Sequence, residues 1–133
     1  MKELSGLHPY LRPYAEAAVK WAEGQGVRVE ITSVKRTWSE QDRLYQNYQT
    51  CKRAGAFPSS RSLNPGLSCA YPANPPGYSS HNYGFSWDSV LPDELMPWWV
   101  KVREAYGWRV PPNDLIHAEL PEWEAYADPK LLL

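Results

Sequence analysis

The sequence predicts an α+β fold in which about three helices pack against a small antiparallel sheet. Apolar residues recur at helical spacing over about 9–24, 38–49 and 93–106. Shorter segments, in which apolar and polar residues alternate as in half-buried strands, lie between and after these helices. Because the chain has only 133 residues, we expect one domain, 1–133, around a single core.

The N-terminal part of the chain is expected to form a helix followed by a strand. The helix, about 9–24, ends at the glycines of positions 24 and 26. Its expected apolar face consists of Leu11, Tyr14, Ala18, Trp21 and Ala22. Val27, Val29 and Ile31 then alternate with polar residues, which indicates a strand with one buried face.

A capping box marks the start of the second helix. Thr37 and Glu40 have the spacing at which each side chain hydrogen-bonds the backbone N–H of the other. The helix is expected over about 38–49, with Leu44, Tyr45 and Tyr48 on its apolar side. Residues 52–79 are rich in Pro, Ser and Gly and show no periodicity, so we expect a long loop at the rim of a functional site.

The C-terminal half alternates short strands with one helix. A strand over 84–91 is expected to place Phe85, Trp87 and Ser89 on one face and Ser86, Asp88 and Val90 on the other. A helix over about 93–106 ends at Gly107. Further expected elements are a short strand at 108–110, a strand at 115–120 and a helical turn at 121–126.

Charge and hydropathy exclude several classes of protein. The formal net charge is −1, so neither nucleic acid nor an anionic membrane surface is an expected partner. No apolar run approaches the about 20 residues that cross a bilayer, and 1–6 lack the apolar core of a signal peptide. We therefore expect a monomer without a membrane anchor, made in the cytoplasm.

Two features of the composition leave alternatives open. The seven Trp and nine Tyr either build the core or line a groove for an extended peptide or glycan. Cys51 and Cys69 flank the Pro-rich loop and either form a disulfide or remain free thiols. A cysteine-based zinc site is not expected, because the chain has no C-x-x-C pair.

Two segments concentrate groups that bind metals. His81 and Asp88 lie in S-S-H-N-Y-G-F-S-W-D, and Asp114, His117 and Glu119 lie in D-L-I-H-A-E. Two imidazoles and one carboxylate suit a Zn²⁺ ion with an open fourth position, and a further carboxylate can act as a base. The remaining histidine, His8, is expected to be solvated and is not assigned to the metal.

The two segments resemble the motifs S-x-H-x-x-G-x-A/S-x-D and E/D-x-x-H-x-E of the D-Ala-D-Ala carboxypeptidase and L-Ala-D-Glu endopeptidase family. This VanY-like family, to which phage endolysins belong, consists of zinc peptidases that cut peptidoglycan stem peptides. A third segment, S-V-K-R-T with Gln41 and Leu44-Tyr45, resembles more loosely the family motif S-x-x-R-S/T followed by E-Q-x-x-L-Y. The three similarities occur in the family's order between about 30 and 123.

The resemblance implies a Hedgehog/DD-peptidase-like fold, whose small sheet carries the zinc, and a role for each matching residue. His81, Asp88 and His117 correspond to the metal ligands. Asp114 corresponds to the catalytic base, and Arg36 to an arginine that binds a substrate carboxylate or stabilises the oxyanion. Ser79 is expected to bind substrate or to position the His81 loop, and Gln41 is expected to brace the local backbone. Glu119 is expected either to orient an imidazole or to form a salt bridge.

The activity implied is zinc-dependent hydrolysis of peptidoglycan stem peptides. The aspartate at position 114, where the family also uses glutamate, favours an L-Ala-D-Glu endopeptidase of the phage endolysin type, acting on the cell wall or periplasm after release. The alternatives are a D-Ala-D-Ala carboxypeptidase, a non-catalytic zinc-binding module similar to the Hedgehog domain, and a phage structural protein that docks on the wall. The long 52–79 segment departs from the family pattern, so the resemblance does not define substrate preference.

Overall fold

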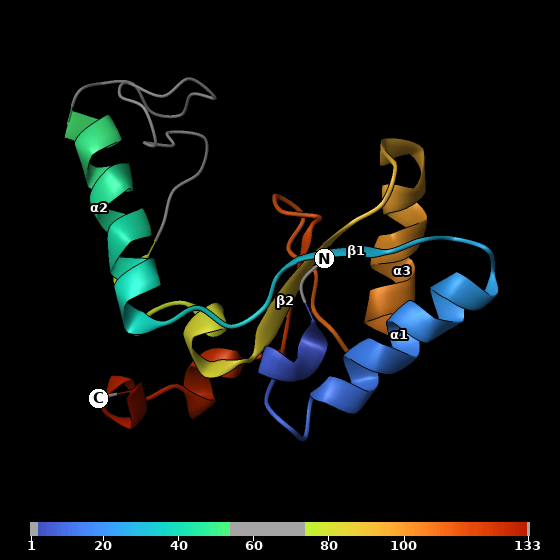
Figure 1. Ribbon diagram of the computed structural model, residues 1–133, viewed down its shortest axis with the longest axis horizontal. Coiled ribbons are helices and arrows are strands. Elements are labelled where there is room, and N and C mark those ends of the chain that lie inside the picture. The colour runs from blue at the N-terminus through green and yellow to red at the C-terminus, as the bar shows by residue number, and fades with distance from the viewer. Residues whose placement is uncertain (1–2, 54–73, 133) are drawn as a thin grey trace.

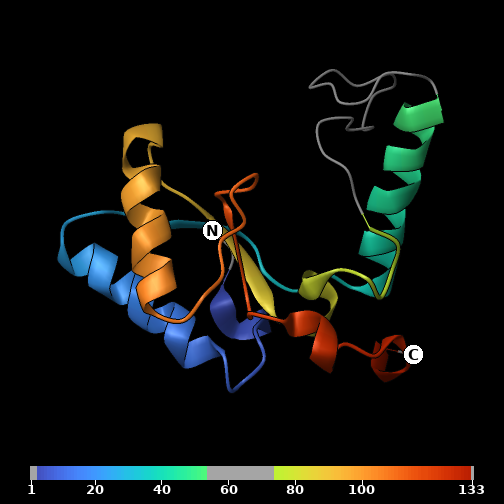
Figure 2. The same ribbon diagram turned by 180° about the vertical axis from the view of Figure 1, so that it is seen from behind.

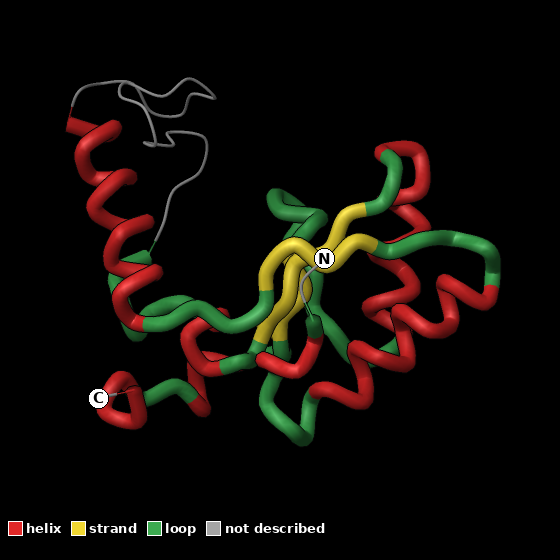
Figure 3. The backbone as a smooth tube through the Cα atoms, viewed as in Figure 1, coloured by secondary structure: helices red, strands yellow, loops and turns green. Residues whose placement is uncertain are grey.

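The structure, a computed structural model, describes residues 3–53 and 74–132. A three-stranded antiparallel sheet of order β1-β2-β3 lies at its centre (Figures 1 and 3). The strands are β1 (Glu30–Ser33), β2 (Ser86–Val90) and β3 (His117–Glu119). The helices are α1 (Arg12–Gly24), α2 (Trp38–Arg53) and α3 (Met96–Ala105). The predicted α+β class, with three helices around a small sheet, is confirmed.

The hydrophobic core lies between the sheet and the pair α1 and α3. Trp87 of β2 is fully buried, and its ring meets Trp99 and Trp108 edge-on at centroid distances of 6.0 and 5.8 Å. Ser89 points to the same side and accepts a hydrogen bond from Trp99 Nε1 at 2.8 Å. Three tryptophans therefore build the core, and β2 has the face assignment that its alternation predicts.

The buried face of α1 differs from the predicted one. The helix buries Ala15, Ala18 and Ala22, whereas Tyr14 and Trp21 are 57% and 43% exposed. Alanines at positions i, i+3 and i+7 form a narrow stripe that allows close approach to the core, so the larger rings lie at its border. Trp21 packs there against Trp98 of α3, with ring centroids 5.7 Å apart.

Helix α2 stands apart from α1 and α3, on the opposite side of the sheet in both views (Figures 1 and 2). Its predicted capping box is confirmed: Thr37 N donates to Glu40 Oε1 at 3.2 Å, and Glu40 N donates to Thr37 Oγ1 at 3.1 Å. The helix continues to Arg53, beyond the predicted end. Cys51 is buried and disulfide-bonded, while Cys69 and most of the 52–79 segment lie outside the described residues.

The C-terminal segments are shorter than predicted. The strand expected at 108–110 is a single bridge between Arg109 and Glu119, and the strand expected at 115–120 is limited to β3. Residues 114–117 form a turn instead, closed by the hydrogen bond from His117 N to Asp114 O at 3.1 Å. A 3-10 helix at Trp123–Tyr126 confirms the predicted final turn. Within the described ranges, no helix is long and apolar enough to cross a membrane.

The 3-10 helix η2 (Ser80–Tyr83) precedes β2 and ends at Gly84, whose carbonyl accepts from His8 N of the N-terminal segment at 2.9 Å. Gly84 has φ +72°, and a Cβ atom there would lie 2.8 Å from Gly6 O and 2.9 Å from His8 N. Both contacts are to backbone atoms, which cannot rotate away. A glycine at this position is therefore required by the turn that leads from η2 into β2.

We expect Gly84→Ala to destabilise the protein by more than about 2 kcal/mol, because the left-handed backbone and the steric overlap both oppose a side chain. Gly24→Ala is the matched control, since a Cβ there meets no atom within 4 Å and the residue ends a helix. Chemical denaturation measures both variants. Equal stability of the two variants would contradict the packing described for Gly84.

Candidate functional site

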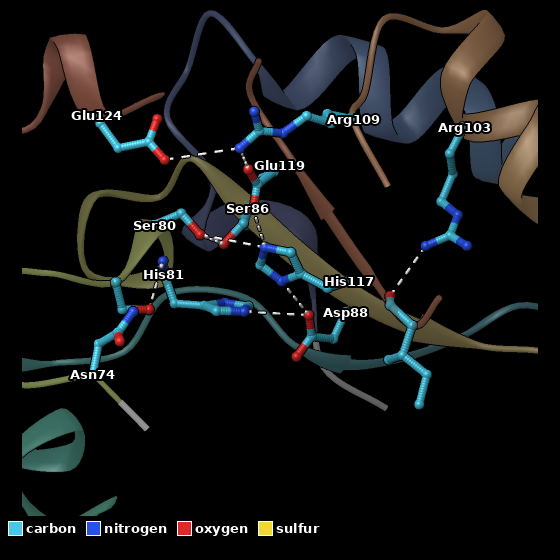
Figure 4. A network of polar contacts seen from close by, with 12 residues as sticks. Asn74, Ser80, His81, Ser86, Asp88, Arg103, Arg109, His117, Glu119 and Glu124 are labelled. Carbon is cyan, nitrogen blue, oxygen red and sulfur yellow. Dashed lines mark hydrogen bonds and ion pairs between the residues drawn. The ribbon is translucent and has the colours of Figure 1, made fainter. Parts of the chain in front are cut away.

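Three side chains from β2, β3 and η2 converge beside the sheet (Figure 4). The register of β2 and β3 places Asp88 directly opposite His117, and η2 holds His81 next to them. Asp88 Oδ1 lies 3.2 Å from His81 Nε2 and 3.0 Å from His117 Nδ1. Among the described residues this is the group of three whose ligand atoms all lie within 4.8 Å of one another.

Hydrogen bonds on the far side of each ring fix which nitrogen faces Asp88. His81 Nδ1 lies 2.5 Å from the carbonyl oxygen of Val34, which can only accept a hydrogen bond. His117 Nε2 lies 2.8 Å from Glu119 Oε1. When these two nitrogens carry the protons, His81 Nε2 and His117 Nδ1 are free to bind a metal, which is the arrangement that outer carboxylates and carbonyls impose on metal-binding histidines.

Two of the donor-atom spacings in this group match those of zinc ligands. Tetrahedral ligands at about 2.0–2.1 Å from Zn²⁺ lie about 3.3 Å from one another. The two distances to Asp88 Oδ1, 3.2 and 3.0 Å, are close to this value. Two imidazoles and one monodentate carboxylate would leave a fourth position for water.

The local charges favour a cation at this point. Burial opposes the protonated form of His117, but hydrogen bonds to Asp88 and Glu119 outweigh it and raise the pKa of His117 to about 9. Burial likewise opposes the charged form of Asp88, yet hydrogen bonds to the two imidazoles hold the pKa of Asp88 well below its usual range. Asp88 therefore stays ionised, and a proton or a metal ion balances its charge.

Further polar residues support this group. Glu119 is buried and reaches His117 with one oxygen and Arg109 with the other (Figure 4). Both expectations for Glu119, orienting an imidazole and forming a salt bridge, are therefore seen together. Ser79 is buried at the N-cap of η2, where its hydroxyl accepts from His81 N at 3.3 Å. This contact positions the His81 segment.

Arg36 lies beside Asp88 of the candidate metal site. Its Nη2 is 3.8 Å from Asp88 Oδ2, and its Nη1 donates to Gln41 Oε1 at 3.4 Å. Burial lowers the pKa of Arg36, while the negative charges of Asp88 and Glu40 act in the opposite direction. Gln41 is almost completely buried and donates to Asn74 O at 2.7 Å. Gln41 thus contacts both the backbone at Asn74 and the Arg36 guanidinium.

Asp114 lies in the turn that leads into β3. Its N–H donates to Pro111 O at 3.0 Å, and its own carbonyl accepts from His117 N at 3.1 Å. Desolvation raises the pKa of Asp114, with a smaller opposing effect of His117 and a further increase from Asp88. The charges of His117 and Asp88 thus influence this carboxyl group, although it is not one of the three converging groups.

Sequence reasoning missed Arg103, the residue that fastens this turn. The side chain is fully buried, and its guanidinium donates to the carbonyl oxygens of Trp99, Ile116 and Leu115 at 3.2, 3.1 and 2.5 Å. Burial lowers the pKa of Arg103 to about 10, opposed by Asp88 and Asp114. Arg103 thus holds the two residues between Asp114 and His117. The only signal in the sequence is its spacing of four from Trp99 on a helix.

We expect Arg103→Met to lower the free energy of unfolding by about 3 kcal/mol or more, because three buried carbonyl groups lose their donor. The same substitution at Arg28, which is exposed before β1, is the control and should change stability little. Denaturant unfolding measures both. If Arg103→Met is as stable as Arg28→Met, the guanidinium does not hold the turn.

Comparison with known proteins identifies the fold. No protein-family model matches the chain, and no curated protein matches its sequence. Among solved structures, VanYB in complex with D-alanine-D-alanine has a TM-score of 0.66 and 19% identity, over 93% of this chain and 78% of that one. The vancomycin-resistance D,D-pentapeptidase VanY from a VanB-type cassette, a mutant in complex with Zn(II), has a TM-score of 0.64 and 19% identity, over 90% and 75%.

A third similar structure is the LD-carboxypeptidase LdcB, with a TM-score of 0.63 and 21% identity over 92% of this chain and 69% of that one. The chain therefore has the fold of the VanY and LdcB peptidases. The predicted DD-peptidase-like architecture is confirmed, and two of the three residues of the candidate metal centre, Asp88 and His117, lie on its sheet.

Proposed function

We propose that this protein is a zinc-dependent peptidase that hydrolyses peptidoglycan stem peptides at the cell wall. The observation that carries the proposal is the convergence of His81 Nε2, Asp88 Oδ1 and His117 Nδ1, with Arg36 3.8 Å from Asp88 and Asp114 in the turn that leads into β3. The fold adds support, because the similar VanY structures are described as complexes with Zn(II) and with D-alanine-D-alanine.

Each residue of the site has a task in such a hydrolysis. A zinc ion held by the three ligands would polarise a water molecule and lower its pKa to about 7. Asp114 takes the proton as the water oxygen adds to the peptide carbonyl, and returns it to the leaving nitrogen as the C–N bond breaks. Arg36 stabilises the negative charge that develops on the carbonyl oxygen. Glu119 keeps the His117 ring in the orientation in which Nδ1 faces the ligand position.

We propose the L-Ala-D-Glu bond as the one that is cut, as in a phage-type endolysin. The support is the sequence resemblance, in which an aspartate base at position 114 favours the endopeptidase group. A D-Ala-D-Ala carboxypeptidase is the second candidate, because VanYB, a structure with the same fold, is described with D-alanine-D-alanine bound. A purely structural zinc module is disfavoured, since such a module needs no carboxylate at position 114.

Digestion of purified peptidoglycan, followed by mass spectrometry of the products with and without a chelator, tests the proposal. New N-terminal D-Glu together with free L-Ala ends, abolished by chelation, is the expected result. Release of terminal D-Ala instead would establish the carboxypeptidase. Absence of cleavage by folded, zinc-loaded protein would overturn the enzymatic function and favour the binding module.

A further inference from the structure

A cleft lies close to the candidate metal site. It has a volume of about 410 Å³ and lies between the N-terminal segment, the end of β1 and the first turns of α2. Two of its lining residues contact the metal ligands: Val34, whose carbonyl accepts from His81, and Arg36, which lies 3.8 Å from Asp88. Val34 contacts His81 on the side away from the metal position, so Arg36, beside Asp88, is the residue that connects this cleft to a substrate placed at the metal.

The cleft carries an excess of positive charge. Its charged lining residues are Glu3, Lys35, Arg36, Glu40 and Arg43. The carboxylate of Glu40 accepts the N–H of Thr37 in the capping box, and Arg36 is engaged by Gln41 and Asp88. Arg43, in contrast, has no hydrogen bond or ion pair in the described part of the chain, and it projects from a helix whose first turn the capping box fixes.

We propose that this cleft binds a carboxylate of the stem peptide close to the scissile bond, and that Arg43 is the residue that recognises it. The inference rests on the proposed function. An arginine fork pairs with a carboxylate through two parallel hydrogen bonds, which a neutral amide cannot match. Arg36 adds positive charge on the metal side of the cleft, and Lys35 adds it at the wall formed by the end of β1. The cleft thus determines specificity for an acidic stem peptide over its amidated form.

Paired synthetic stem peptides test this inference. The members of each pair differ only in a free carboxylate or a carboxamide at the same residue, one pair for each carboxylate of the stem. Values of kcat/KM are measured for the zinc-loaded wild type, Arg43→Gln and Arg53→Gln. Arg53 is the matched control, because it is an exposed arginine of the same helix that does not line the cleft.

The wild type and Arg53→Gln are expected to prefer the acidic member of one pair by about tenfold, mainly through KM. In Arg43→Gln the ratio of kcat/KM for the acidic peptide to kcat/KM for the amidated peptide should fall to near one. A general loss of stability would not change this ratio, because both peptides are measured on the same protein. An unchanged ratio in Arg43→Gln, with peptides still cleaved, overturns the role of the cleft and leaves the proposed function intact. If the zinc-loaded wild type cleaves none of the peptides, the proposed function fails and this inference fails with it.

Discussion

Replacing Asp114 by Asn is expected to lower kcat by about 10²–10⁴-fold while leaving zinc binding and the fold intact. The charges of His117 and Asp88 influence this carboxylate, yet it is not one of the three converging donors. Asparagine has nearly the same shape but cannot accept the proton of the attacking water. The backbone hydrogen bonds from Asp114 N to Pro111 O and from His117 N to Asp114 O do not depend on the side chain.

Hydrolysis of a stem peptide by zinc-loaded protein, together with the zinc content and the melting temperature, measures this effect. Asn113→Ala is the control, because Asn113 is an exposed neighbour in the same turn. A zinc-loaded Asp114→Asn variant with wild-type kcat would show that another group acts as the base. Loss of activity with zinc retained would also separate the enzyme from a structural zinc module, which does not need this carboxylate.

Removal of a single imidazole should have the largest effect of all, because it affects both the metal and the fold around it. His117→Ala is expected to lose stoichiometric zinc binding and all measurable hydrolysis. The substitution leaves Asp88 without its partner across β2 and β3, and leaves Glu119 with Arg109 alone. Without the third ligand, the remaining two donors bind zinc far more weakly.

Metal analysis after dialysis, and the melting temperature with and without a chelator, test this prediction. A chelator should lower the melting temperature of the wild type, because a ligand that binds only the native state stabilises it, and should have no effect on His117→Ala. His8→Ala is the control: this histidine is exposed and stacks on Tyr10 at a centroid distance of 5.6 Å, away from the converging group. Retention of one zinc per chain by His117→Ala would refute the ligand set.

The sequence was sufficient for features that depend on local interactions. The capping box at Thr37 and Glu40 is formed as predicted, since its two hydrogen bonds join residues three apart. The alternation of β2 correctly separated Trp87, in the core, from Asp88, in the site. The face predicted for α1 was right for Ala18 and Ala22 but wrong for Tyr14 and Trp21. The choice between alanines and larger rings depends on how closely the helix approaches the core.

The candidate metal ligands were identifiable from motifs, but the way they are held was not. Asp88 lies opposite His117 because of the register between β2 and β3, and the two residues are 29 positions apart in the sequence. The Val34 carbonyl that orients His81 comes from a third segment, 47 residues away. Neither contact has a signature in sequence spacing.

The sequence by itself determined the secondary structure of the longer elements, the candidate metal-binding groups and the family that they resemble. Only the tertiary structure decided that Arg103 fastens the turn between Asp114 and His117, and that Arg43 and Arg36 line the same charged cleft. The physical reason is common to both. The role of Arg103 and the charge of the cleft both depend on groups that lie on other segments of the chain. Those groups are brought together by the packing of the whole chain, so the neighbouring residues in the sequence do not reveal them.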